Sequence, residues 1–218
     1  MDGSAAKTVL LDLPFGGRWL ARNSPARCVP SHGSDAFGER YAIDFIAVDD
    51  RGLPAPRTWR TFLSVEPPEL FRGFGVPILA PAAGTVVLTH DGEPDHEARR
   101  SQLALLPYAL GQARRVRAGV AAIAGNHVVV ALEPGGPFVL LAHLRQGSVR
   151  VRPGQSVRSG DQVAECGNSG NSTQPHVHVQ VTDSTHWPTA KGLPVAFRRT
   201  GESGEGSWIP AESEIFTA

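Results

Sequence analysis

The sequence predicts a mainly β protein, and two observations support this fold class. The 218 residues include 24 glycines and 18 prolines but one methionine, and 41% of them are hydrophobic. Short apolar runs recur along the chain, separated by clusters of glycine, proline, serine and asparagine. Both features are typical of many short strands joined by turns rather than of a helical bundle. Because this length fits one domain, we expect residues 1–218 to form a single domain.

The N-terminal part of the chain predicts three strands and one long loop. Residues 8–22 contain an apolar run, a turn and a second strand, and residues 23–39 form an irregular loop rich in proline, serine and glycine. The next predicted strand, residues 40–48, is apolar except for Asp44. Because an unpaired buried charge is costly, Asp44 either faces a cleft, pairs with a cation such as Arg40, or binds a metal.

The middle of the chain alternates predicted strands with longer connections. Residues 49–75 contain four prolines and are expected to form an insertion, and residues 76–88 predict two strands around a turn. Leucine, alanine and arginine recur at helical spacing over residues 98–117, so this insertion is the one predicted helix. Residues 127–144 predict a hairpin whose second strand ends close to His143.

The last part of the chain is expected to be less regular. Residues 147–167 repeat short valine-rich strands between turns, and residues 195–197 predict a last short strand. Glycine, glutamate and serine dominate after that strand. We therefore expect the C-terminal tail, residues 198–218, to be loosely held.

The functional prediction depends on a turn at residues 167–174 and the strand that follows it. Strict alternation places His176, His178 and Gln180 on one strand face and three valines on the other. Neighbours on one face lie roughly 6.6 Å apart, so the two imidazoles can converge on one metal-bound group. Two exposed histidines without function are the simpler interpretation of so short a motif. A catalytic zinc site needs further imidazole or carboxylate ligands from elsewhere in the chain.

Composition limits the other function classes. Lys+Arg and Asp+Glu are both 21, so no overall basic field supports nucleic-acid binding. No apolar run approaches the roughly 18 to 20 residues of a membrane span. The N-terminus shows no signal peptide, so we expect the cell wall or the extracellular space if the chain is exported, and the cytoplasm otherwise. Cys28 and Cys166 are compatible with one disulfide or with two separate thiols.

Several motifs occur together in an order and spacing that resemble the lysostaphin/LytM-type zinc metallopeptidases, the M23 family. The motifs lie within a core of about residues 40–182, namely at residues 41–45, 76–86, 125–128, 142–144, 151–157 and 167–178. This combination is far more specific than a His-x-His motif alone. The resemblance implies an antiparallel β-sheet groove, one Zn²⁺ per chain, and cleavage of peptide cross-links in bacterial peptidoglycan.

The resemblance also implies a role for individual residues. Asp44 corresponds to the family's carboxylate ligand and His178 to its C-terminal histidine ligand. His143 and His176 correspond to the two unliganded histidines, which polarise the metal-bound water or stabilise the oxyanion that forms on the scissile carbonyl.

This sequence departs from the family pattern at the first histidine ligand. That ligand usually lies four residues before the aspartate, where this chain has Arg40, and an arginine cannot ligate zinc. His32 is the nearest substitute, because the loop after it can fold back toward Asp44 at a modest entropic cost.

Two functions follow from these observations. The first is a zinc-dependent endopeptidase acting on peptidoglycan peptides or similar Gly/Ala-rich peptides, expected to be a monomer, with the loops at 49–75 and 91–118 walling the groove. The second is a catalytically inactive, M23-like binding or regulatory module that has lost its metal and pairs Arg40 with Asp44. Four of the five site residues are present in order, which favours the enzyme. A carbohydrate-binding domain is a weaker third interpretation, because the four tryptophans are scattered.

Overall fold

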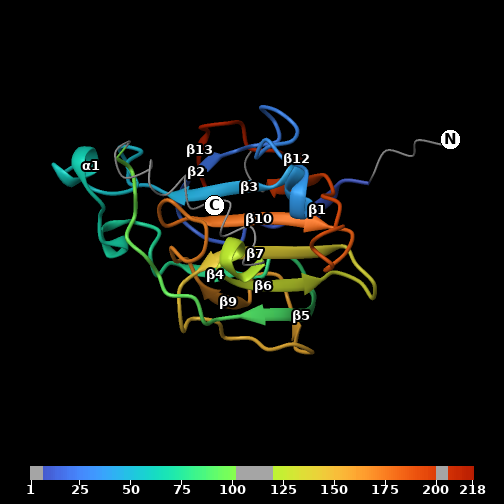
Figure 1. The fold of residues 1–218 in the computed structure, drawn as a ribbon. Helices are drawn as coiled ribbons and strands as arrows, with labels where there is room; N and C mark the ends of the chain where they lie inside the picture. The colour runs from blue at the N-terminus through green and yellow to red at the C-terminus, as the bar shows by residue number, and fades with distance from the viewer. Residues whose placement is uncertain (1–6, 102–119, 200–205) are drawn as a thin grey trace.

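The computed structural model describes residues 7–101, 120–199 and 206–218, and it confirms a mainly β fold (Figure 1). Its largest sheet has eight strands in the order β13-β2-β3-β10-β7-β6-β5-β8, and every neighbouring pair in it is antiparallel. In that order the strands are Ile215–Thr217, Arg18–Arg22, Ile43–Ala47, Val177–Thr182, Phe138–Leu144, Asn126–Ala131, Gly84–His90 and Ser156–Val157.

The described residues also form two smaller sheets and four short helical segments. One sheet joins β1 (Val9–Leu11), β11 (Val195–Arg199) and β12 (Gly206–Trp208), with β1 and β11 parallel. The other pairs β4 (Pro77–Leu79) with β9 (Gln162–Glu165). The helical segments are η1 (Ala36–Tyr41), α1 (Arg60–Leu63), η2 (Pro68–Leu70) and α4 (Val120–Ala124). None of the helices in these residues is long and apolar enough to cross a membrane.

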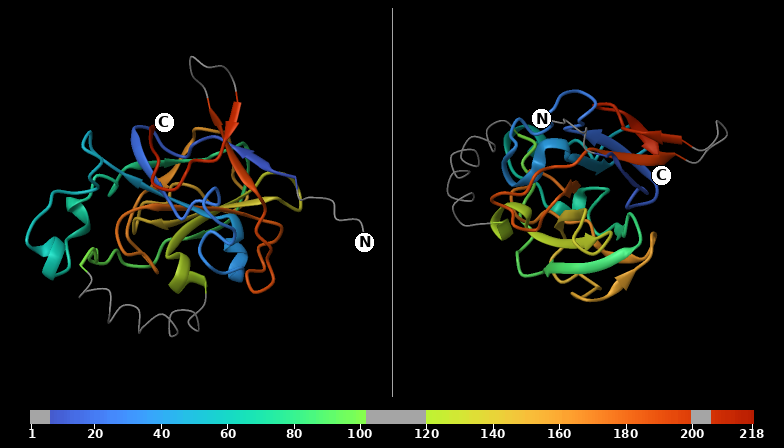
Figure 2. Two further views of the ribbon diagram at one scale, coloured as in Figure 1. Left: turned by 90° about the horizontal axis from the view of Figure 1, so that it is seen from above. Right: turned by 90° about the vertical axis from the view of Figure 1, so that its right-hand side faces the viewer.

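The two faces of the main sheet have different environments. Valines 177, 179 and 181 of β10 are buried in the main hydrophobic core, as the alternating pattern predicts, together with side chains of β2, β3, β6 and β7. On the opposite face, Leu140 and Ala142 of β7 join a second apolar cluster with Ala124 of α4 and Trp187. Helix α4 therefore packs over part of the face on which His178 and Gln180 lie (Figure 2).

Most predicted strands are present, and their ends differ where short helices replace extended chain. The strand predicted at residues 40–48 begins at Ile43, because residues 36–41 form the 3₁₀ segment η1. The helix predicted at residues 98–117 is not helical at 98–101, where Ala98 instead bridges to Glu66. Residues 102–117 of that prediction lie outside the described residues.

The C-terminal residues differ from the prediction of a loosely held tail. Strand β12 pairs with β11, and β13 pairs with β2 as an outer strand of the main sheet. Each of these strands has only three residues, so no apolar periodicity reveals it in the sequence. Residues 206–208 and 215–217 therefore belong to the sheets, and residues 200–205 of the predicted tail lie outside the described residues.

Two glycines bring the segment after β9 against the start of β6. Gly125 has φ +62° and Gly170 has φ +68°, and a Cβ on either one would overlap the backbone of the other glycine or of Ser169. Asn171 N also donates to Ile123 O at 2.8 Å. This close approach fixes Ser169, whose carbonyl holds a site histidine described below, so both positions require glycine.

We expect Gly125→Ala to lower the free energy of unfolding by more than about 2 kcal/mol, because strain at positive φ adds to a backbone clash. Gly147→Ala is the matched control, since Gly147 also has positive φ but a Cβ there meets nothing within 4 Å. The control should lose only about 1–2 kcal/mol. Urea denaturation of both variants checks this, and equal losses would contradict the close-approach argument.

Candidate metal centre

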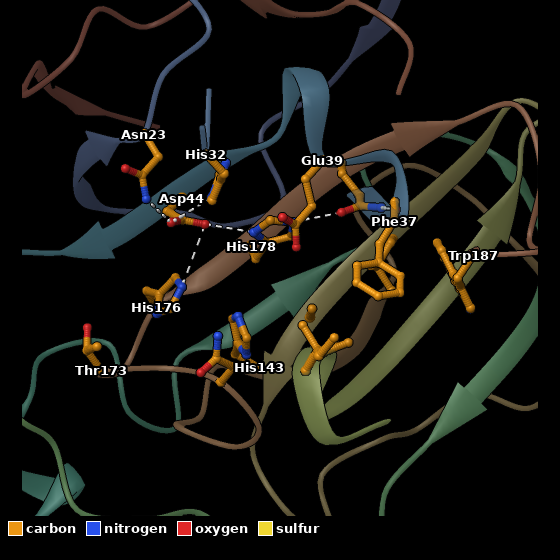
Figure 3. Close-up of a pocket in the computed structure, with 16 residues that line it drawn as sticks. Asn23, His32, Phe37, Glu39, Asp44, His143, Thr173, His176, His178 and Trp187 are labelled. Atoms are coloured by element: carbon orange, nitrogen blue, oxygen red, sulfur yellow. Dashed lines mark hydrogen bonds and ion pairs between the residues drawn. The ribbon is translucent and has the colours of Figure 1, made fainter. Parts of the chain in front are cut away.

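Three side chains from distant parts of the chain converge on one point (Figure 3). Asp44 Oδ1 lies 2.9 Å from His178 Nδ1, and Asp44 Oδ2 lies 3.2 Å from His32 Nε2. One ligand atom from each of the three residues lies within 4.8 Å of the others. All three side chains are mostly buried, with 16% of His32, 10% of Asp44 and 8% of His178 exposed to solvent. Two imidazoles and one carboxylate in this arrangement match the donor set of a catalytic zinc site, which keeps a fourth position open.

The sheet itself positions two of these residues. Asp44 of β3 and His178 of β10 are directly opposite each other in the antiparallel pairing, so their side chains share one face of the sheet. Asp44 can face this site rather than the core because strand alternation turns its neighbours Ile43 and Phe45 into the core. The alternation predicted for β10 therefore places the His178 side chain next to the Asp44 carboxylate.

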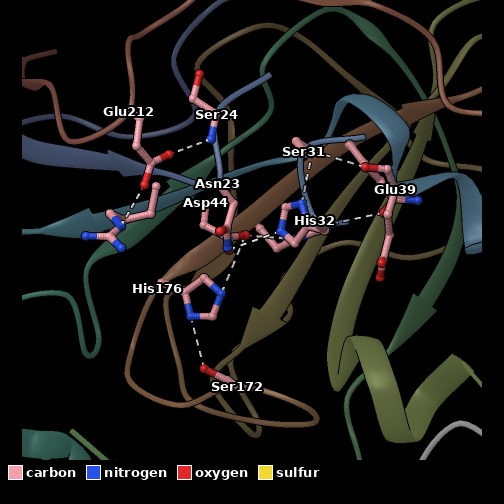
Figure 4. Close-up of polar contacts among 12 residues, drawn as sticks. Asn23, Ser24, Ser31, His32, Glu39, Asp44, Ser172, His176 and Glu212 are labelled. Atoms are coloured by element: carbon pink, nitrogen blue, oxygen red, sulfur yellow. Dashed lines mark hydrogen bonds and ion pairs between the residues drawn. The ribbon is translucent and has the colours of Figure 1, made fainter. Parts of the chain in front are cut away.

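His32 comes from the loop before η1, and hydrogen bonds hold this loop against that segment. Ser31 N donates to Arg40 O at 3.0 Å, and Ser31 Oγ donates to Glu39 O at 3.2 Å (Figure 4). These bonds bring His32 beside the backbone of residue 40, which is the position at which the family pattern has its first histidine ligand. The loop thus delivers an imidazole to Asp44 although position 40 is an arginine.

Arg40 pairs with Asp35 and not with Asp44. Its guanidinium binds both carboxylate oxygens of Asp35, at 2.7 and 2.8 Å, and it lies 5.7 Å from the ring centroid of Tyr41. These contacts lie on the exposed side of η1. The pairing of Arg40 with Asp44 that the alternative function requires is therefore absent from the described residues.

Hydrogen bonds on the far side of each imidazole orient the rings. His178 Nε2 donates to Gln180 Oε1 at 2.9 Å, and Gln180 Nε2 donates to Phe37 O at 2.9 Å. Ser31 Oγ lies 3.1 Å from His32 Nδ1. These partners turn Nδ1 of His178 and Nε2 of His32 toward Asp44. Partners of this kind fix the ring orientation and the tautomer of metal-binding histidines.

Electrostatics keep the centre ionised when no metal is bound. Burial alone would raise the pKa of Asp44, but attraction to His176 and hydrogen bonds from His178 and His32 hold this pKa well below its usual value. Burial would likewise lower the pKa of His178, but its hydrogen bond to Asp44 and the charge of that carboxylate raise it to about 9. The folded protein thus holds the ionised Asp44 carboxylate beside the protonated His178 ring. A cation that binds there would displace the His178 proton.

The other two predicted site residues, His143 and His176, lie next to each other beside this centre. Their ring centroids are 4.6 Å apart, and His176 Nε2 lies 3.6 Å from Asp44 Oδ1. His143 Nδ1 donates to Ser169 O at 3.0 Å, and His176 Nδ1 donates to Gln174 O at 2.8 Å. Burial lowers the pKa of both rings, and for His143 repulsion from His176 and His178 lowers it further. Both rings are therefore neutral at pH 7, with Nε2 as the proton acceptor.

The five residues line one cavity of about 270 Å³. Its polar end holds Asp44 and the four histidines, and Phe37 and Trp187 lie toward its other end (Figure 3). A concave site in which a few polar groups converge beside apolar side chains is the usual form of a ligand or substrate site.

A further residue, Asn23, touches the centre and was not predicted from the sequence. Asn23 follows β2, has φ +51°, and donates from Nδ2 to Asp44 Oδ2 at 2.7 Å. It sits in a loop rich in proline, serine and glycine, and an asparagine is not a typical zinc ligand. Its neighbour Arg22 lies opposite Asp44 in the strand register, but this pairing leaves no signal in the sequence.

The comparisons with known proteins agree with the resemblance noted in the sequence. The family model for Peptidase family M23 matches residues 108–190, which is less than half of the chain. This range contains His143, His176 and His178, whereas His32 and Asp44 precede it. The match confirms the resemblance to M23 peptidases and supports a peptidase, and the geometry above joins His32 and Asp44 to the matched part.

Solved structures similar to this chain include three peptidases. A mutant catalytic domain of the prophage-encoded M23 protein EnpA from Enterococcus faecalis has 18% identity and a TM-score of 0.40, covering 70% of this chain and 73% of that one. The catalytic domain of lysostaphin from Staphylococcus simulans has 16% identity and a TM-score of 0.40, covering 86% and 88%. A zinc-containing peptidase from Vibrio cholerae has 17% identity and a TM-score of 0.33, covering 64% and 46%.

We expect Gln180→Leu to weaken zinc binding about 10- to 100-fold, because His178 loses the partner that orients it while the three proposed ligands remain. Competition with a fluorescent zinc chelator measures this affinity. Gln146→Leu, at an exposed glutamine away from the cavity, is the control and should bind zinc as the wild type does. Unchanged affinity in Gln180→Leu would show that this hydrogen bond does not support the centre.

Proposed function

We propose that this M23-like chain is a zinc-dependent endopeptidase that hydrolyses peptide bonds of peptidoglycan cross-links or similar Gly/Ala-rich peptides. The observation that carries the proposal is the convergence of His32, Asp44 and His178, with two neutral histidines beside them in the same cavity. The match to Peptidase family M23 supports the choice of a peptide as substrate.

In the proposal, His32 Nε2, one oxygen of Asp44 and His178 Nδ1 would hold one zinc ion per chain. The donor set fits this ion, because catalytic zinc commonly has three protein ligands from imidazole and carboxylate groups. Zinc would supply a Lewis acid that polarises a carbonyl and lowers the pKa of a water molecule toward 7. Gln180 and Ser31 hold the two imidazoles in the orientation that this binding needs.

The two remaining histidines would move protons. Since Nδ1 of each ring is committed to a backbone carbonyl, Nε2 of each ring is free to accept a proton. Their lowered pKa values keep them neutral, so either can take a proton from the attacking water at neutral pH. The resulting imidazolium can then donate to the oxygen of the scissile carbonyl or to the leaving amine. His143 and His176 are thus the proposed catalytic pair.

The remaining features of the proposal follow from this chemistry. The chain would act as a monomer with one domain, and it would meet its substrate in the cell wall or another extracellular space. The segments at 49–75 and 91–118 would limit which peptides reach the cavity, and their residues from 102 onward lie outside the described part of the chain. The inactive, metal-free module is the alternative, and the pairing of Arg40 with Asp35 gives it no support.

We expect His143→Ala and His176→Ala each to lower hydrolysis of purified peptidoglycan at least about 100-fold while the protein still binds one zinc ion per chain. Release of new amino groups measures activity, and elemental analysis measures zinc. His186→Ala is the control, because this exposed histidine binds Thr189 and lies outside the cavity. Full activity in both site variants would remove the catalytic pair from the proposal, and no hydrolysis by the zinc-loaded wild type would remove the activity itself.

A further inference from the structure

The insertion between β3 and β4 carries an exposed apolar surface. Helix α1 projects from the body of the molecule in two perpendicular views (Figures 1 and 2). Trp59, Phe62 and Leu63 are each 65% exposed, whereas the other large apolar side chains that are exposed in the described residues reach only 38–42%. We call these three residues the apolar knob. Three large apolar side chains exposed together indicate an interaction site.

An ion pair and hydrogen bonds hold the base of the insertion in place, so the knob has a defined position on the protein. Glu66 is fully buried and accepts two bonds from Arg100, at 2.6 and 2.7 Å. Thr61 Oγ1 donates to Glu66 at 3.1 Å, and Ser101 Oγ donates to Phe62 O at 2.7 Å. These contacts hold α1 in place while the three knob side chains stay largely exposed.

The charged residues within the knob segment are both basic. From residue 55 to residue 65 the chain contains two arginines, Arg57 and Arg60, and no acidic residue. Both arginines are exposed, and Arg60 lies 5.5 Å from the ring centroid of Trp59. Indole beside guanidinium, with aliphatic and aromatic side chains next to them, is typical of the interface between lipid headgroups and acyl chains.

We propose that the apolar knob docks on an anionic phospholipid bilayer, with Trp59, Phe62 and Leu63 entering the interface and Arg57 and Arg60 contacting headgroup phosphates. Charge complementarity favours an anionic surface over a neutral one. Phe62 and Leu63 favour lipid over a sugar chain, because neither side chain offers a hydrogen bond to a hydroxyl. A tryptophan at the tip suits the interface, where an indole is apolar on its faces and polar at its nitrogen.

The knob lies beside a second cavity. This cavity is lined by Arg57, Thr61, Phe62 and Thr173, and Thr173 also lines the metal-centre cavity. Docking at the knob would therefore place the bilayer on the side of the molecule that carries the second cavity. This inference does not rest on the proposed peptidase activity, since it concerns other residues.

The test is binding of the full chain to vesicles of phosphatidylglycerol mixed with phosphatidylcholine, compared with vesicles of phosphatidylcholine alone. We expect at least about tenfold stronger co-sedimentation with the anionic vesicles, and a shift of Trp59 emission to shorter wavelength on binding. The Trp59 signal is the difference between the wild type and Trp59→Phe. Trp59→Ser/Phe62→Ser/Leu63→Ser should lower binding at least about tenfold. Arg57→Gln and Arg60→Gln should each lower it about fivefold.

Matched controls distinguish vesicle binding through the knob from nonspecific binding through other exposed side chains. Leu88→Ser/Ile209→Ser removes two apolar side chains that are each 38% exposed elsewhere, and Arg152→Gln/Arg158→Gln removes two exposed arginines of the 147–167 region. Both controls should bind vesicles as the wild type does. The proposal is overturned by equal binding to both vesicle types or by unchanged binding of the triple variant. A Trp59 emission already typical of a buried indole without vesicles overturns it too, as does binding to an anionic polymer such as heparin but not to vesicles.

Discussion

The structure depends on how the chain satisfies one buried carboxylate. Asp44 lies within an otherwise apolar, buried strand of the main sheet, where an uncompensated charge would cost on the order of several kcal/mol. Three imidazoles and one amide surround it: His32, His176, His178 and Asn23. Folding thus desolvates this carboxylate and surrounds it with hydrogen-bond donors. In the proposal, a divalent cation would take the place of the proton that His178 shares with Asp44.

In the proposal, the binding site tolerates an arginine at position 40 in place of the usual histidine. The strand register fixes the Asp44–His178 pair, and one further donor would complete a three-ligand zinc site. The loop before η1 supplies it, because Ser31 binds the backbone of residues 39 and 40 and so sets His32 beside Asp44. Backbone contacts do not depend on the side chain at position 40, which leaves Arg40 free to pair with Asp35 on the surface.

Local patterns predicted part of this arrangement, and the resemblance predicted more. The alternation around His176–Gln180 predicted the faces of β10, and the isolated charge marked Asp44, because both signals are contained in a few consecutive residues. Strand pairing across 134 residues, as between Asp44 and His178, leaves no local signal, so the meeting of these side chains came only from the resemblance. Asn23 and the β13 strand escaped prediction, since a loop amide and a three-residue strand carry no periodicity. The apolar knob likewise requires exposure, which a sequence does not show.

The most direct test of the central claim is the zinc content of the wild type, His32→Ala and Arg40→Ala, each purified without chelator and then offered zinc. The account predicts about one zinc ion per chain in the wild type and in Arg40→Ala, and loss of the ion in His32→Ala, because a three-ligand site does not hold zinc with two. Zinc retained by His32→Ala would mean that another residue completes the site. A wild type that stays free of metal would contradict the metal centre as a whole.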